Sequence, residues 1–408
     1  MFSLFLLLLC PFLSLPFIFH NIYYNNKSAF ILLAFFMAAY SFYFVPSGDQ
    51  FRYWLYFYHY IEDYMSDISL TNFSLPYILM WLIHSMHGSY ELFRGIVVLI
   101  SYLLFIHIYF DMQERFEFQK KYNPQECFLI FLIYFLIIPY FSLVTGLRFG
   151  FGLCICIYSI YQLFVCQNTK WASVCGILSS LSHPFFAFFI PFLLIIKALY
   201  KSTILCMLFS CIYLIFMLIF MTRSSFCQSL LEVYISSDSM WKTGDIGDVL
   251  GRNAMLGVYI QTLFTFLAII ALFFTAFANL PWQTDESIPH LKQIRAFTVL
   301  TVFLYFVFFS YFTIQGRLGV FLSVLIPMFI IMLILVHKIK TFYLLLFFGY
   351  MFLLFSFRFM SFRTPRSVGY EYKFLYSTFF QDVTMHYDED FIYKNINIED
   401  GSVFITNK

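Results

Sequence analysis

The stretch LGVFLSVLIPMFIIMLILVH, residues 318–337, decides the fold class of this chain. As a helix that rises 1.5 Å per residue, a run of about 20 residues spans roughly 30 Å, the thickness of a bilayer's hydrocarbon core. Lipid satisfies no backbone polar group, so such a run crosses the membrane as a helix whose hydrogen bonds are all internal. The stretch therefore predicts a membrane-spanning α-helix.

Similar apolar runs recur along all 408 residues, of which 62% are hydrophobic and 11% charged. The mean hydropathy of +0.81 lies far outside the range of soluble domains. The runs do not alternate in polarity as the strands of a transmembrane barrel do. We predict an all-α, polytopic integral membrane protein with about twelve helices, ten to thirteen being compatible with the pattern. The expected spans are 2–19, 29–46, 92–110, 126–143, 149–166, 170–182, 184–197, 203–222, 254–279, 296–315, 318–337 and 341–357.

The distribution of basic residues predicts the orientation. We expect one membrane domain, residues 1–357, followed by a polar tail, residues 358–408. Short loops with Lys and Arg stay on the cytoplasmic side. Placing the basic loops inside puts the loops 47–75 and 223–253 outside, together with the tail, although Arg358 by the same rule favours the cytoplasm. The residues placed inside are Lys27, Arg115, Lys120, Lys121, Lys170, Lys197, Lys201, Lys292, Arg295, Lys338 and Lys340.

Charge and cysteine content exclude two classes of function. The net charge is +2 and no basic run exists, whereas nucleic-acid binding needs clustered Lys and Arg. Most of the nine cysteines lie inside apolar runs, where cysteine behaves as a small hydrophobic residue. Cys154 and Cys156 form a C-x-C pattern, which is neither a zinc spacing nor a redox motif. We therefore expect no nucleic-acid partner and no metal ligated by cysteine.

The informative residues are the ionisable ones at the ends of apolar runs, because a charge within the membrane is costly and faces a polar cavity or marks a functional site. The predicted topology brings five of them to the outer leaflet. Arginine forks match phosphate oxygens, so three arginines at a lipid interface predict a phosphorylated lipid. The five residues are Asp49, Arg52, Arg148, His183 and Arg317.

Each of these residues also has a structural interpretation. An arginine at a helix end can extend to the lipid headgroups, Asp49 can cap the helix that follows it, and His183 before Pro184 can be a buried corner residue. Their joint occurrence favours function, since GLRFG and QGRLG flank an arginine with glycines that let a ligand approach the backbone. We predict Asp49 or His183 as the base that activates a hydroxyl.

Four segments together resemble the EpsG family of polysaccharide polymerases, which is related to the Wzy O-antigen polymerases. They are SGDQFRYWLYF after an early helix, GLRFGFGLCICIYSIY at a helix start, SLSHPFFAFFIPFLL at a helix corner and GRLGVFLSVLIPM near the end. The resemblance is one of order and context over about residues 40 to 340. One departure concerns Arg148, which is followed by Phe149 where the family often has Arg-Gln.

The resemblance implies a polymerase in the bacterial inner membrane that joins oligosaccharide repeat units on undecaprenyl pyrophosphate at the periplasmic face. The growing glycan passes from its lipid pyrophosphate to a hydroxyl of the incoming lipid-linked unit. The reaction so implied uses neither a nucleotide sugar nor a metal or other cofactor. Arg52, Arg148 and Arg317 then bind pyrophosphate or glycan. The lipid-linked oligosaccharide, the bilayer and a protein that regulates chain length are the partners implied.

Two alternatives of other classes stay open at this point. A membrane glycosyltransferase that uses a polyprenyl-phosphate monosaccharide needs several acidic residues in the first external loop, often with a metal, and Glu62, Asp63 and Asp67 fit that description. A flippase for lipid-linked oligosaccharide needs two related halves and charges along a central passage, whereas the notable charges here gather at one leaflet.

Overall fold

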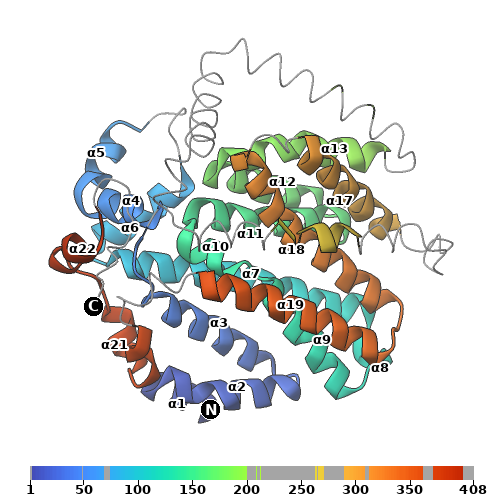
Figure 1. Ribbon diagram of the computed structural model, residues 1–408, viewed down its shortest axis with the longest axis horizontal. Coiled ribbons are helices and arrows are strands. Elements are labelled where there is room, and N and C mark those ends of the chain that lie inside the picture. Colours follow the sequence, from blue (N-terminus) through green and yellow to red (C-terminus); the bar gives the residue numbers. More distant parts are fainter. Residues whose placement is uncertain are drawn as a thin grey trace. The chain divides into compact units, whose positions relative to one another are not determined.

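The computed structural model describes residues 2–47, 49–68, 74–199, 208, 212, 262–263, 265–270, 289–307, 312–361 and 371–397 (Figure 1). In this part of the chain the regular elements are helices, as predicted. Those discussed below are α1 (Phe2–Leu9), α2 (Pro11–Tyr23), α3 (Lys27–Ser41), α4 (Asp49–Leu55), η1 (Tyr56–Tyr60), α5 (Ile61–Ser66), α6 (Leu75–Ser85), α7 (Tyr90–Phe116), α8 (Phe118–Lys121), α9 (Pro124–Ile137), α10 (Tyr140–Thr145), α11 (Leu147–Phe164), α12 (Thr169–Ser182), η2 (Pro184–Phe188), α13 (Phe189–Leu199), α17 (Pro289–Val307), α18 (Phe312–Val336), α19 (Thr341–Ser361), η4 (Glu371–Leu375), α21 (Phe379–Thr384) and α22 (Glu389–Asn395).

Five helices in the described residues are long and apolar enough to cross a membrane. Their spans are Tyr90–Phe116, Pro124–Thr145, Leu147–Phe164, Ile314–Val336 and Thr341–Phe359. The expected span 203–222 and the loop 223–253 lie outside the described residues, apart from two isolated positions, and 254–279 is described in small part. The all-α membrane class is confirmed, and the number of spans and the boundary at residue 357 stay predictions.

The chain forms two compact units, each described here by itself. The first contains Met1–Ser159, Ser173–Ala187 and Lys340–Lys408, and the second contains Ile160–Ala172 and Phe188–Ile339. The division falls inside α11 and α12, so both units contain parts of these two helices.

The single first span predicted over residues 2–19 is wrong, because the chain breaks between α1 and α2. Pro11 has no backbone N–H and starts α2, as proline commonly does at a first helical position. The two helices then lie antiparallel: the Phe2 and Phe17 ring centroids are 5.1 Å apart, and Asn21 donates to the Ser3 hydroxyl at 2.7 Å. A helical hairpin therefore replaces the long helix.

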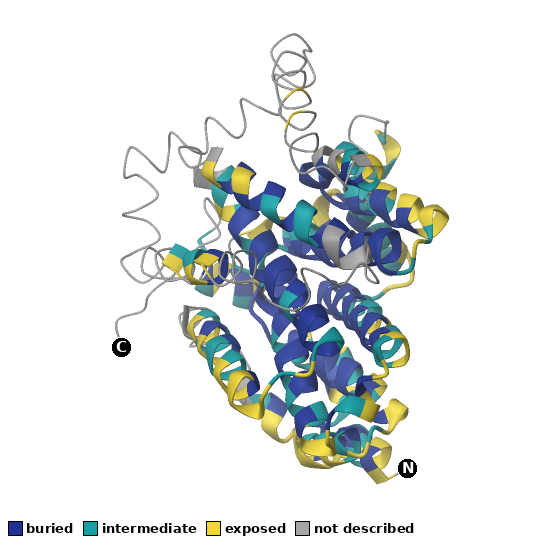
Figure 2. Ribbon diagram, turned by 90° about the vertical axis from the view of Figure 1, so that its right-hand side faces the viewer, coloured by how far each residue is buried: buried dark blue, intermediate teal, exposed yellow. Residues whose placement is uncertain are grey.

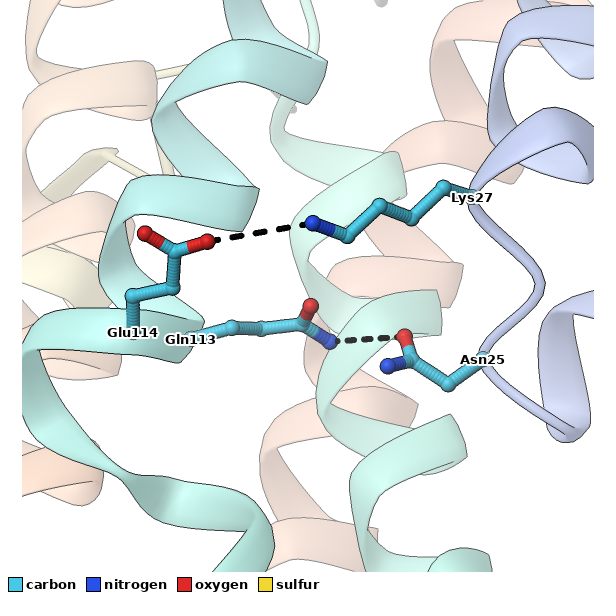
Figure 3. A network of polar contacts seen from close by, with 4 residues as sticks. All are labelled: Asn25, Lys27, Gln113 and Glu114. Carbon is cyan, nitrogen blue, oxygen red and sulfur yellow. Dashed lines mark hydrogen bonds and ion pairs between the residues drawn. The ribbon is translucent and has the colours of Figure 1, made fainter.

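Helices α3 and α7 pack side by side in opposite directions and form the centre of the first unit. At one end Lys27 lies 3.8 Å from the Glu114 carboxylate, and Gln113 donates to Asn25 at 3.0 Å (Figure 3). At the other end Arg94 donates from Nη2 to the backbone carbonyl just beyond α3 at 3.1 Å. These contacts fix which residues share an end of the bundle.

The lysine-bearing loops of the first unit meet at the Lys27 end. The short helix α8 connects α7 to α9, and Thr341 at the start of α19 donates to Glu126 at the start of α9 at 2.5 Å. Because α9 and α10 then run back along α7, α11 begins at the opposite end, where Arg94 lies. The basic loops of the first unit, with Lys27, Lys120 and Lys121, therefore share one end of that unit, and Arg148 and Asp49 belong to its other end.

Burial separates inner from peripheral helices (Figure 2). In the most apolar window of α11, 83% of the residues are buried within the protein, against 17% in that of α19. Helix α19 packs on α9 by one side and presents Phe, Leu and Tyr side chains outward, as expected of a helix that faces lipid.

In the second unit, phenylalanine rings join α13, α17 and α18. The Phe189 ring centroid lies 6.0 Å from that of Phe297 and 4.8 Å from that of Phe321. Arg317 was predicted to lie in a loop between two helices, and this placement is wrong: α18 begins at Phe312, so Arg317 is inside its first two turns. The low helix propensity of the glycines at 316 and 319 does not prevent helix formation, because the packing of neighbouring apolar residues stabilises α18.

Close packing of α11 against α10 explains the glycine at position 150. A Cβ there would lie 2.5 Å from the Ser142 carbonyl carbon and 2.7 Å from the Leu143 nitrogen, both backbone atoms of α10. The close approach of α10 and α11 fills the space, so this glycine serves helix packing instead of admitting a ligand. At Gly146, by contrast, the nearest atom to a Cβ would be 3.6 Å away.

We predict that Gly150→Ala lowers the stability of the protein by about 1–3 kcal/mol, the usual cost of overpacking, whereas Gly146→Ala does not. Thermal unfolding of the two purified variants in the same detergent measures the difference. A midpoint for Gly150→Ala equal to that of the wild-type protein would contradict the packing of α10 against α11.

Candidate functional site

Asp49 and Arg52 lie at the start of a helical segment formed by α4, η1 and α5. The segment turns its large apolar side chains inward, where Phe51, Trp54 and Phe57 are at most 1% exposed. On the outer face the Arg52 guanidinium lies 3.9 Å from the Asp49 carboxylate, and both side chains are mostly exposed. Asp49 and Arg52 therefore lie beside each other, in a place that a ligand can reach.

Arg148 reaches the same region from the second position of α11. Its guanidinium carbon lies 5.3 Å from the centre of the Tyr77 ring, in a cation–π contact with α6. The Tyr77 ring in turn packs on Tyr53 of α4 and on Tyr64 of α5, with centroids 6.2 Å and 4.7 Å away. The Nε of Arg148 is buried without a hydrogen-bond partner, so part of the guanidinium's donor capacity remains unused. Tyr77 thus joins Arg148 to α4, the helix that begins at Asp49.

His183 lies at the predicted corner between α12 and η2. It is 8% exposed, its ring packs edge-on against Phe149 with centroids 5.6 Å apart, and its Nδ1 accepts the backbone N–H of Phe185 at 3.2 Å. An imidazole whose Nδ1 accepts carries its proton on Nε2 when neutral. To act as a base, His183 would first have to give up the bond to Phe185.

The structure places Arg148 on Tyr77, which packs on the helix that carries the Asp49–Arg52 pair, and places His183 against the neighbour of Arg148. Arg317 lies in the second unit, and its convergence with the others stays a prediction. A Cβ at Gly316 would meet no described atom within 4 Å, so the backbone beside Arg317 is open, unlike the backbone at Gly150. In the described part of the chain no three His, Cys, Asp or Glu side chains form a group that could hold a metal ion.

Sequence reasoning missed a buried polar cluster beneath α4. Glu91 and Arg94 at the start of α7 are both 0% exposed. Arg94 stacks over the Tyr90 ring with 5.7 Å between the guanidinium carbon and the centroid, and the Tyr90 hydroxyl donates to Gln50. The i, i+3 spacing of Glu and Arg was the signal available in the sequence. The cluster fixes Gln50, the residue next to Asp49.

The C-terminal segment completes the support of α4. The Tyr43 hydroxyl and the Ser377 hydroxyl each donate to Oδ1 of the buried Asp382 at 2.5 Å. Further along, the Tyr387 hydroxyl donates to the Tyr43 carbonyl at 2.6 Å, and the Trp54 indole donates to the Tyr387 carbonyl at 3.3 Å. The tail, predicted as a polar cap, therefore packs on α3 and α4 directly behind the candidate site, as Figure 1 shows for α22 beside α4.

Asp382 is the titratable group of this joint. Burial raises the pKa of its carboxyl, and the hydrogen bonds from Ser377 and Tyr43 offset part of that rise. The other carboxylate oxygen, Oδ2, has no hydrogen-bond partner. Because the pKa in the folded state is raised, the protonated acid is the form that the tail's docking favours.

Comparison with known proteins decides the family. The model of the EpsG family matches residues 29–377, which is most of the chain. The chain belongs to the EpsG family. No curated protein and no solved structure matches it.

Membership in the EpsG family makes this chain a multi-pass membrane protein of the polysaccharide-polymerase type. The matched region contains α4, α6 and α11, which form the candidate site, and extends as far as Ser377 at the Asp382 joint. The four segments that carried the resemblance also lie inside it.

We predict that docking of residues 371–397 weakens as the pH rises from acidic to neutral. The sign follows from Asp382: a raised folded-state pKa contributes stability that is complete below the unfolded pKa and is lost as the pH rises through the folded one. Hydrogen exchange of α21 and α22 across this pH range measures the docking. The variant Asp382→Asn keeps an acceptor for Tyr43 and Ser377 without a charge, so its protection should be at least that of wild type at neutral pH and vary less with pH. Lower protection in this variant at neutral pH would contradict the assignment.

Proposed function

We propose that this EpsG-family protein is a repeat-unit polymerase of O-antigen or exopolysaccharide synthesis. It transfers the growing glycan from undecaprenyl pyrophosphate to a lipid-linked repeat unit at the periplasmic face of the bacterial inner membrane. The observation that carries the proposal is that a partly buried arginine, Arg148, contacts Tyr77, which packs on the helix that begins with the exposed carboxylate of Asp49, at one end of the first unit. A carboxylate can act as the base for an acceptor hydroxyl, and a guanidinium matches the oxygens of a leaving pyrophosphate.

In the proposed reaction, the oxygen of an acceptor hydroxyl attacks the anomeric carbon of the donor glycan. The new C–O bond forms as the bond from that carbon to the pyrophosphate oxygen breaks, and the lipid pyrophosphate leaves with the electron pair. Arg148 stabilises the charge that develops on the leaving group, because a guanidinium donates in a fork that matches phosphate oxygens. Arg317 is proposed to serve the same pyrophosphate from the second unit.

Asp49 is proposed to take the proton of the acceptor hydroxyl, and Arg52 at 3.9 Å orients its carboxylate or binds acceptor phosphate. His183 was predicted as the alternative base. The geometry supports Asp49 better, because it is exposed beside the arginine site while Nδ1 of His183 already accepts a backbone N–H. We propose that His183 holds the corner after α12 and so keeps Phe149, next to Arg148, in place.

A metal-dependent transferase using a polyprenyl-phosphate monosaccharide is the second candidate, since Glu62, Asp63 and Asp67 lie on or just after α5. The two candidate functions require different carboxylates: Asp49 for the polymerase, and the acids on or just after α5 for the metal-dependent transferase. This difference makes Asp63, an exposed acid of the same helical segment, a suitable control for Asp49.

We predict that Asp49→Asn leaves single repeat units in place of long chains, because loss of a general base lowers the rate about 10²–10⁴-fold. Asp63→Asn, which removes the same charge from the same segment, should retain wild-type chain length. The surface glycan of a deletion strain complemented with each variant, at matched membrane levels, gives the comparison. Long chains from Asp49→Asn would exclude it as the base, and a loss confined to Asp63→Asn would favour the metal-dependent transferase.

We predict that Arg148→Lys and Arg317→Lys each lose most polymerase activity at unchanged expression, because lysine keeps the charge but loses the fork. Arg115→Lys, at the opposite end of α7, should have no effect, since its partner Asp111 also accepts from an ammonium. Glycan chain length is again the measurement. If both Arg148→Lys and Arg317→Lys give wild-type chain lengths, the pyrophosphate is bound elsewhere.

A further inference from the structure

Five tyrosines form a surface around the Asp49–Arg148 site that the proposed chemistry does not use. Tyr77 of α6 is the centre: its ring centroid lies 5.3 Å from that of Tyr56, 4.7 Å from that of Tyr64 and 6.2 Å from that of Tyr53. Tyr60 continues the surface, with its centroid 5.8 Å from that of Tyr56. These five residues are called the tyrosine platform below.

The side chains along α4, η1 and α5 are sorted by polarity. Phe51, Trp54 and Phe57 point inward, whereas the platform residues Tyr56 and Tyr60 are 38% and 52% exposed. The chain has 60 Phe and 31 Tyr, yet in this segment both phenylalanines are buried and the exposed aromatic rings apart from His59 are tyrosines. A surface that served only to face lipid would not need a hydroxyl on every ring.

The local backbone also departs from regularity at the platform. Residues Tyr56–Tyr60 form a π-helical turn between α4 and α5, and such turns are rare and often mark functional sites. The C-terminal segment covers one flank of this turn: the His59 imidazole lies 3.5 Å from the Glu389 carboxylate, and the Tyr393 ring packs on Trp54 with centroids 6.5 Å apart. Tyr56 packs on Tyr77 of α6, the residue that Arg148 contacts, and Tyr60 packs on Tyr56.

We propose that the tyrosine platform binds the sugar rings of the acceptor repeat unit and holds its hydroxyl at Asp49. The proposal rests on the polymerase function argued above and names where that function's acceptor lies. An aromatic face carries negative partial charge and attracts the polarised C–H groups of a pyranose ring, while the phenol O–H supplies hydrogen bonds to sugar hydroxyls. The platform therefore fits a neutral, hydroxyl-rich ring, and Arg148 at its edge fits the pyrophosphate of the lipid-linked donor.

An alternative occupant is the membrane itself, because tyrosine is enriched at membrane–water interfaces. The two occupants differ in what they need from the ring. A bound sugar contacts the aromatic face and, in part, the hydroxyl. If Tyr56 and Tyr60 only anchor the protein in the membrane interface, they do not contribute to the affinity for the glycan. Binding measured with and without sugar on the same lipid separates them.

The test uses the full-length protein in nanodiscs and two probes. One probe is the lipid-linked repeat unit extracted from cells that lack this protein, and the other is undecaprenyl pyrophosphate without sugar. Native mass spectrometry measures the affinity for each. The variants are Tyr56→Ala and Tyr60→Ala, their Phe counterparts, and Tyr24→Ala as a control, since Tyr24 is 69% exposed at the opposite end of α3.

We expect Tyr56→Ala and Tyr60→Ala to weaken binding of the sugar-bearing lipid by about tenfold and to leave binding of the bare lipid unchanged. The Phe variants should lose less, because the stacking face remains, and Tyr24→Ala should lose nothing. Equal affinity of wild type and both Ala variants for the sugar-bearing lipid would overturn the platform while leaving the polymerase function standing. Failure of the wild-type protein to bind either lipid would overturn the proposed function itself.

Discussion

The buried hydrogen bond from the Tyr43 hydroxyl to the Asp382 carboxylate ties the end of the described chain to the residues that follow α3. A carboxylate that is 0% exposed is costly unless it is hydrogen-bonded, and Ser377 supplies a second donor to the same oxygen. The bond is long-range in sequence, and it closes the first unit around α4. The candidate site therefore depends on residues more than three hundred positions away from it.

This joint continues into the cluster beneath α4. The Glu91 carboxylate accepts the backbone N–H of Tyr387 at 3.4 Å, and Arg94 donates to the Phe42 carbonyl. Several atoms of the cluster, including Arg94 Nε and Nη1, have no hydrogen-bond partner. A buried polar atom without a partner is costly, so the hydrogen bonds that Glu91 and Arg94 do make matter for the packing beneath α4. The buried cluster keeps the exposed Asp49 in a fixed position, as a reacting group requires.

Those features that depend on hydropathy and on helix-end signals could be predicted from the sequence. The apolar runs indicated the membrane class, and the glycine-flanked Arg148 indicated the start of α11. The break at Pro11 was missed because a short hairpin and a long helix have the same composition, although proline at a first helical position was visible. Arg317 was misplaced because glycines beside an arginine resemble a loop, while packing kept α18 helical. The role of Asp382 and of Glu91 depends on long-range packing, which no local pattern specifies.

The two candidate bases, Asp49 and His183, illustrate the same limit for function. Asp49 was identified by its place after an apolar run, and the structure adds the link of its helix to Arg148 through Tyr77. By sequence, His183 was an equally good candidate base. The hydrogen bond that Nδ1 accepts from the Phe185 backbone depends on the geometry of the corner, which the sequence does not reveal. The tyrosine platform was hidden in a chain with so many aromatic residues, and the inward and outward sorting that distinguishes it appears once burial is known.

Reconstitution tests the central claim most directly. The purified protein is placed in liposomes with the lipid-linked repeat unit as sole substrate, and glycan length and free undecaprenyl pyrophosphate are followed together by mass spectrometry. The account predicts a ladder of glycans that differ by one whole repeat unit, with one undecaprenyl pyrophosphate released for each new linkage. Products that grow by single sugars and need an added polyprenyl-phosphate monosaccharide, or lipid that crosses the bilayer without any new linkage, would contradict it.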